Sequence, residues 1–171
     1  MVIKDILIIA NIRCGGTYLM KSLAKTYSLN KVWEPNNLYH YSKPSVIKVN
    51  AAMHSMEALV EYSEYFSKVI LLDRKDKKAQ LESAVHMFSN DGVIDVKWVW
   101  KDNSYSAITI KESKDRINSH TTRIKELSRN LKLPITYYED IYLYGKKLKD
   151  LVFNPDPSEK LRMKPRKKTL N

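Results

Sequence analysis

Short apolar runs, separated by longer stretches with helical periodicity, are the feature that most restricts the fold of this chain. The runs lie at Val2–Ala10, Val46–Val49, Lys68–Leu72 and Ile135–Tyr138. Nearly continuous apolar runs of this length are typical of strands that are buried on both faces of a parallel sheet. Strands that alternate with helices predict an α/β domain with three layers and a mainly parallel central sheet.

The helices are predicted from apolar residues that recur every three or four positions. They are expected at Thr17–Tyr27, Met53–Phe66, Asp76–Phe88 and Ile117–Leu131, with a short one at Asp140–Leu151. Residues Trp98–Ile110 have weak periodicity and predict no element, and Asp91-Gly92 is a turn signal. A chain of 171 residues has the size of one domain, so we expect a single domain over residues 1–171, ending in a basic tail at about 158–171.

The formal net charge of +11 favours a polyanionic partner, although a solvated, lysine-rich surface explains much of the same charge. Cys14 is the only cysteine, which excludes an internal disulfide and favours a reducing cytoplasm. The four histidines show no ligand spacing, so no metal is expected. No apolar run approaches about 18 residues, so no membrane insertion is expected. Lys4 and Asp5 inside the first run favour a strand over a signal peptide.

A glycine-containing turn, Ala10–Leu19 (ANIRCGGTYL), joins the first predicted strand to the first predicted helix. Backbone N–H groups at a helix start are unpaired, and glycines allow an anion to approach them closely. The turn is not a Walker A loop, because that pattern would place Gly16 where its lysine stands. Either the turn binds no ligand, or it forms an anion cradle from the residues Arg13, Cys14, Gly15, Gly16, Thr17 and Tyr18.

A second candidate site follows the third predicted strand, within Val69–Phe88. Arg74 comes directly after the strand, and Ser83 lies about two turns into the next helix. A guanidinium can bind a phosphate in a bidentate manner, and a serine hydroxyl adds a neutral donor. The alternative is a surface helix that begins at a capping Asp76 and carries solvated charges.

Both segments resemble parts of the sulfotransferases that use 3′-phosphoadenosine-5′-phosphosulfate (PAPS). Arg13–Leu19 resembles the loop R-S-G-[ST]-T-x-L, with departures at Ile12, Cys14 and Gly16, where that family usually has Pro, Ser and Ser or Thr. The second segment is similar to the pattern R-x-D-K-x-x-Q-x-x-S of bacterial trehalose-type enzymes, which it matches at Arg74, Asp76, Lys77, Gln80 and Ser83.

A third segment, Tyr138-Glu139-Asp140-Ile141, resembles a Y-E-D-L motif that occurs late in many of these enzymes. We interpret it as a marker of the fold, and we expect its acidic residues to cap the helix that follows.

The resemblance implies a P-loop-like nucleotide-binding fold and an enzyme that transfers a sulfuryl group from PAPS to a hydroxyl or amine acceptor, with carbohydrates among the candidates. The product would be 3′-phosphoadenosine-5′-phosphate (PAP), and no metal or nucleic acid would be required. Arg13 would contact the transferring group, while Arg74 and Ser83 would hold the 3′-phosphate. Arg166 and Lys167, in the basic tail, would close over the 3′-phosphate and the adenine.

A sulfuryl transferase also needs a general base for the acceptor's proton. Glu34, in Trp33-Glu34-Pro35, is the first candidate, because the trehalose-type enzymes carry a catalytic glutamate in a similar setting. His54 is the second candidate and His40 the third. Lys48 lies near the place where many of these enzymes carry a lysine.

Three other functions stay open at this point. A P-loop-like kinase or phosphotransferase would use the same scaffold, although the Walker lysine and a clear magnesium-binding acid are absent. A non-catalytic nucleotide- or nucleic-acid-binding domain would also suit the net charge, although no known nucleic-acid motif occurs. A degenerate sulfotransferase that binds the nucleotide but turns over poorly is consistent with the departures in the first loop.

Overall fold

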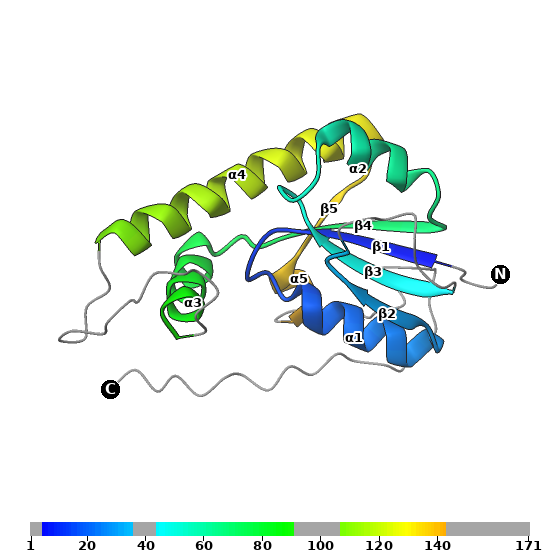
Figure 1. The fold of residues 1–171 in the computed structure, drawn as a ribbon, viewed down its shortest axis with the longest axis horizontal. Helices are drawn as coiled ribbons and strands as arrows, with labels where there is room; N and C mark the ends of the chain where they lie inside the picture. The colour runs from blue at the N-terminus through cyan, green and yellow to red at the C-terminus, as the bar shows by residue number, and fades with distance from the viewer. Residues whose placement is uncertain (1–4, 36–43, 91–106, 143–171) are drawn as a thin grey trace.

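The computed structural model describes residues 5–35, 44–90 and 107–142 as an α/β fold (Figure 1). Its strands form one five-stranded parallel sheet with the order β2-β3-β1-β4-β5. The elements, in chain order, are β1 (Asp5–Ala10), α1 (Gly16–Tyr27), β2 (Asn30–Trp33), β3 (Ser45–Asn50), α2 (Met56–Ser63), β4 (Lys68–Asp73), α3 (Lys77–Asn90), α4 (Ala107–Leu131), β5 (Ile135–Tyr137) and α5 (Tyr138–Tyr142).

Strand β1 is the centre of the sheet. It pairs with β3 on one side, where Ile8 lies opposite Lys48, and with β4 on the other, where Ile8 lies opposite Ile70. Every residue of β1 is buried. Because successive side chains of a strand point to opposite faces, this aliphatic run supplies apolar side chains to both faces of the sheet.

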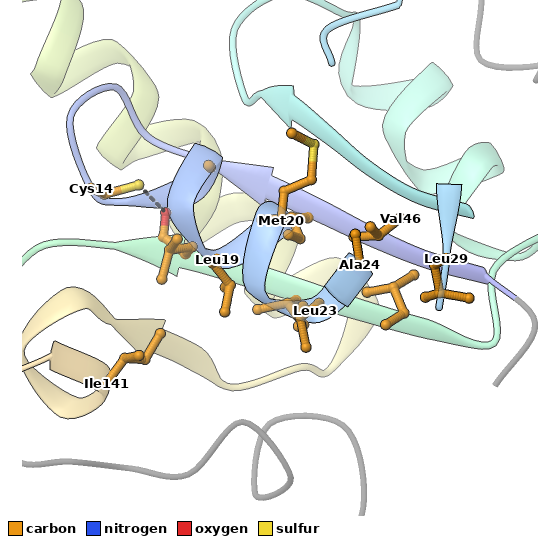
Figure 2. Close-up of a cluster of buried hydrophobic side chains, with 13 residues drawn as sticks. Cys14, Leu19, Met20, Leu23, Ala24, Leu29, Val46 and Ile141 are labelled. Carbon is orange, nitrogen blue, oxygen red and sulfur yellow. Dashed lines mark hydrogen bonds between the residues drawn. The ribbon is translucent and has the colours of Figure 1, made fainter. Parts of the chain in front are cut away.

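Helices α1 and α5 cover one face. Ile6 and Ile8 of β1 pack there against Leu19 and Leu23 of α1, together with Ile141 of α5. Figure 2 shows these α1 side chains directed at the strands. The periodicity of three and four along α1 places its apolar residues on the side that meets the sheet.

Helices α2 and α4 cover the opposite face, so that the fold has three layers. Leu7 and Ile9 of β1 pack there against Leu59 of α2 and against Ile124 and Leu127 of α4. In Figure 1, α2 and α4 lie above the sheet and α1 lies below it. The predicted α/β fold with three layers and a parallel sheet is therefore confirmed.

Helix α3 does not cover the sheet. It lies beyond the C-terminal ends of the strands and beside the first half of α4 (Figure 1). Ala84 of α3 and Ile117 of α4 form a separate buried cluster, against which Ile12 of the β1–α1 loop packs. Helix α3 therefore lies next to the loops that leave the C-terminal ends of the strands.

The sequence-based predictions missed one strand and misplaced several element ends. The four residues of β2, Asn30–Trp33, are mostly exposed at a sheet edge, so they carry no apolar run. Helix α4 begins at Ala107, inside the segment for which no element was predicted. Helix α2 begins only at Met56, because the Ser55 hydroxyl accepts from Ala58 N and caps it there.

Several predictions lie outside the described residues. They are the turn at Asp91-Gly92, the part of the predicted helix beyond residue 142, and the basic tail at 158–171. Within the three described ranges, no helix is long and apolar enough to cross a membrane.

Candidate functional site

The candidate site residues within the described ranges gather at one edge of the sheet. All five strands are parallel, so the loops that leave them start at the same C-terminal edge. The chain leaves β1 towards α1 on one face and leaves β3 towards α2 on the other. Ligands of open α/β sheets bind at such a point, outside the C-terminal ends of the strands.

The loop between β1 and α1 has an unusual backbone. Arg13 and Gly15 both have positive φ angles, of 55° and 82°. Gly15 is the N-cap of α1 and provides no side-chain cap to its first turn. Left-handed backbone at a non-glycine residue costs energy and occurs preferentially at functional sites. Left-handed residues just before a helix start are a feature of anion-binding turns, so the loop is a candidate for that role.

The Cys14 side chain points away from this loop into the core (Figure 2). Its thiol donates to Asn11 O at 2.8 Å and lies 3.6 Å from Leu72 O. Burial raises the pKa of Cys14 to about 12, so the thiol stays protonated at neutral pH. Only the backbone of Cys14 is placed to contact a ligand.

The side chains of Arg13 and Ser83 meet, although 70 positions separate them in the chain. Arg13 Nε donates to Ser83 Oγ at 3.0 Å. Nearby, Gln80 Nε2 donates to Ile12 O at 2.6 Å. Helix α3 thus holds the β1–α1 loop through two side chains that belong to the second sequence motif.

A buried carboxylate, Asp73, connects the ends of β1 and β4. Asp73 Oδ1 accepts from Asn11 Nδ2 at 2.8 Å, from Arg74 N at 2.8 Å and from Lys77 Nζ at 2.7 Å. Asn11 Nδ2 and Lys77 Nζ both also donate to Thr121 Oγ1 of α4, at 2.9 Å. This network, which the sequence did not reveal, fixes α3 and α4 against the central strands.

Arg74 lies on an aromatic ring next to this network. Its guanidinium carbon is 4.3 Å from the centroid of the Tyr138 ring, and its Nε is 3.9 Å from Glu139 Oε1. That Nε is buried and has no hydrogen-bond partner among the described residues. Stacking of this kind fixes the plane of a guanidinium in advance of ligand binding.

The acidic residues of the third motif act differently from the prediction. They lie in the first turn of α5, but Glu139 accepts hydrogen bonds from Lys75 N and Asp76 N, each at 2.9 Å. Asp140 forms an ion pair with Lys75 at 3.0 Å. The motif therefore holds the turn between β4 and α3, which carries Arg74.

Glu34, the first candidate for a general base, follows β2 directly. Its carboxylate forms an ion pair with Lys48 of β3, and Asn50 Nδ2 donates to the same oxygen, Oε1, at 2.7 Å. The sequence analysis did not predict strand β2, which brings Glu34 to this edge.

The two described histidines near the edge have different surroundings. His54, the second candidate for a base, lies edge-on to Tyr62 of α2, and its partial burial lowers its pKa. His120 of α4 accepts from Ala52 N through Nδ1 at 3.2 Å. Burial, reinforced by Lys48 and Arg116, lowers the pKa of His120 to about 4. In the sequence His120 occupied an ordinary core position of an amphipathic helix, so nothing distinguished it.

Tyrosines enclose the other side of the loop. Tyr142 donates from its hydroxyl to Gly15 O at 2.9 Å, and Tyr18, at 40% exposure, lies edge-on to the Tyr142 ring. A Cβ atom added to Gly15 would lie 2.6 Å from Tyr142 Cε2 and 3.1 Å from Tyr138 Cδ2. Two causes, the left-handed backbone and the close ring, therefore require glycine at this position.

We expect Gly15→Ala to lower the free energy of unfolding by about 2 kcal/mol, because it adds backbone strain and displaces the Tyr142 ring. Ser28→Gly is the matched control with the opposite sign. Ser28 has φ 54° at the C-cap of α1, so glycine there should be neutral or stabilising by a few tenths of a kcal/mol. Urea unfolding measures both, and a Gly15→Ala protein as stable as the wild type would contradict the expectation.

For the remaining predicted site residues, the structure gives little beyond their burial. Gly16 is buried and Thr17 half-buried at the start of α1. His40, Arg166 and Lys167 lie outside the described residues.

No family model, curated protein or solved structure matches this chain. Its function must therefore follow from the residues of the site, whose cations and loop geometry suit an anionic ligand.

Proposed function

We propose that this chain is a PAPS-dependent sulfotransferase, which binds a nucleotide with an anionic group at each end and transfers its sulfuryl group to a hydroxyl or amine acceptor. The observation that carries the proposal is the hydrogen bond from Arg13 Nε to Ser83 Oγ. It joins the two sequence motifs at the ends of β1 and β4, which are neighbouring strands. A single nucleotide can therefore reach both motifs.

The phosphosulfate end is proposed to lie at the β1–α1 loop. This loop follows the central strand and opens helix α1, an arrangement that supports a P-loop-like fold for the whole domain. The Arg13 guanidinium would neutralise charge on the leaving phosphate. The lost hydroxyls at Cys14 and Gly16 do not affect the backbone N–H groups that would hold the anion.

The 3′-phosphate end is proposed to lie at Arg74. The guanidinium is stacked on Tyr138, and its Nε lies 3.9 Å from the Glu139 carboxylate. A phosphate would supply the charge-assisted hydrogen bonds that Glu139 does not make at this distance. Ser83, on the adjacent helix, would add a neutral donor.

In the proposed reaction, the acceptor oxygen attacks sulfur and forms a new S–O bond. The bond from sulfur to the phosphate oxygen breaks, and PAP leaves with the electron pair. The proton of the acceptor passes to a carboxylate, for which Glu34 is the candidate at this edge of the sheet. We propose the cytoplasm as the compartment, because the one cysteine, Cys14, is a free thiol in the core, which suits a reducing environment.

PAP without magnesium is expected to raise the melting temperature. At about 100 times its dissociation constant, a ligand adds about 2.7 kcal/mol, which is roughly 5–10 °C for a chain of this size. Arg74→Ala should lose most of that shift, measured against its own ligand-free melting temperature. Arg129→Ala is the matched control, because Arg129 is an exposed cation on α4, and it should keep the full shift.

Other outcomes would favour the other functions. A shift that requires Mg-ATP, with none from PAP, would support a kinase or phosphotransferase. Binding to nucleic acid that falls steeply with added salt would support a nucleic-acid-binding domain. Transfer of labelled sulfate from PAPS to an acceptor separates an active enzyme from a degenerate one that only binds PAP.

A further inference from the structure

The β1–α1 loop lacks a lysine of its own, but a lysine reaches it from another strand. Gly16 stands where a Walker A loop has its lysine. A Cβ atom added at Gly16 would lie 3.3 Å from Lys48 Cε and 3.6 Å from Lys48 Cγ. The aliphatic part of Lys48, a residue of β3, therefore runs along Gly16 and brings its ammonium group past the start of α1.

The Lys48 ammonium group is buried and already holds an anion. Only 8% of the Lys48 side chain is exposed, compared with 26% of the Glu34 side chain. Lys48 Nζ binds Glu34 Oε1 and also donates to Asn50 Oδ1 at 2.7 Å, while Asn50 Nδ2 donates to Glu34 Oε1 at 2.7 Å. Two donors thus converge on one oxygen of a carboxylate whose side chain is partly exposed. A buried cation requires such an anion to offset its desolvation.

The backbone at Glu34 is held in an unfavourable conformation. Glu34 has φ 42°, and its N–H donates to Lys48 O at 2.8 Å. A left-handed residue other than glycine costs about 1–2 kcal/mol, which surrounding contacts must offset. The contacts of its carboxylate with Lys48 and Asn50 are positioned to do so.

We infer that Lys48 and Asn50 form an anion-binding position which the Glu34 carboxylate occupies in the unliganded protein, and from which a sulfate or phosphate group displaces it. Lys48 and Asn50 are not among the proposed nucleotide contacts, so the inference goes beyond them. A tetrahedral dianion carries more charge than a carboxylate and can accept from both donors at once. Its arrival releases Glu34 from Lys48 and Asn50, and under the proposed function the carboxylate becomes free to accept a proton.

The inference is tested by titrating the full chain with sodium sulfate, with sodium chloride added to hold the ionic strength constant. Glu34→Gln keeps an oxygen that can accept from Lys48 and Asn50 but removes the competing charge. We expect the sulfate midpoint of its thermal stabilisation to fall about tenfold below that of the wild type, equivalent to about 1.4 kcal/mol. Glu112→Gln removes one charge from the Glu112–Arg116 pair on α4, which is assigned to neither proposed anion position, and should leave the midpoint unchanged.

Two further measurements separate a binding site from a plain structural ion pair. Adding Lys48→Met to Glu34→Gln should remove the tenfold gain that Glu34→Gln produces in the sulfate midpoint. In the wild-type protein, the NMR signal of the Lys48 ammonium group should shift with sulfate and saturate, which tests the inference even if Glu34→Gln fails to fold. Equal midpoints for wild type and Glu34→Gln, or a Lys48 signal that sulfate does not move, would overturn the inference.

The result of the sulfate titration is independent of the result of the PAP experiment. Saturable sulfate binding at Lys48 without any PAP shift would reject the sulfotransferase proposal and leave the anion position standing. A PAP shift that depends on Arg74, with no sulfate response at Lys48, would support the sulfotransferase proposal and reject the anion-binding position at Lys48.

Discussion

Asp73→Ala is expected to lower the free energy of unfolding by about 3 kcal/mol, because it removes a buried carboxylate that accepts from three donors. Asp73 is 3% exposed and accepts from Asn11, Arg74 and Lys77. Lys77 is 41% exposed along its side chain, so its ammonium group can return to water. The Arg74 N–H is less accessible, and an unsatisfied buried donor costs about 1–3 kcal/mol. The Asn11 amide keeps Thr121 Oγ1 and Ile117 O as acceptors.

Two variants sharpen this measurement. Asp73→Asn keeps an acceptor oxygen and loses only the charge, so its effect should be about half as large. Asp140→Ala removes a more exposed carboxylate whose partner, Lys75, is half exposed, and should cost less than about 1 kcal/mol. Urea unfolding of all three at neutral pH gives the comparison. An Asp73→Ala protein that is no less stable than Asp140→Ala would show that the network does not hold the site together.

The stability of the wild-type protein should fall as the pH drops from about 6.5 to about 4, and His120 is the expected cause. Burial, together with Lys48 and Arg116, lowers the pKa of His120 to about 4 from 6.5, whereas Asp73 and Glu34 oppose this effect. The unfolded chain therefore binds a proton in this pH range that the folded chain does not, so stability is full above pH 6.5 and is lost towards pH 4. At about 1.4 kcal/mol per pKa unit, the loss reaches about 3 kcal/mol.

His120→Asn tests this assignment, because the asparagine oxygen can accept from Ala52 N as His120 Nδ1 does. The variant should lose less stability than the wild type between pH 7 and pH 4.5. His54→Asn is the control, since His54 is less buried and its pKa is lowered by burial alone. If His120→Asn and the wild type lost stability equally over this range, other groups would be responsible for the acid sensitivity.

Local sequence patterns were sufficient to predict the buried strands of the sheet and the helices that pack against its two faces. The apolar run that contains β1 predicted a strand buried on both faces, and Leu19 and Leu23 predicted the face of α1 that meets it. Burial acts on each element separately, so its signal is present in the local sequence. Strand β2 left no such signal because it lies at the edge of the sheet with most of its side chains exposed.

Arg13 and Arg74 each follow a predicted strand, and in a mainly parallel sheet such positions lie at the same edge. It did not show that Ser83 contacts Arg13, that Glu139 holds the β4–α3 turn, or that Lys48 binds Glu34. These pairs join residues from different elements, and no local periodicity reports which polar groups meet after the elements pack. The strand order and the position of α3 decided them, so the chain determined its layers locally and its polar site only through tertiary structure.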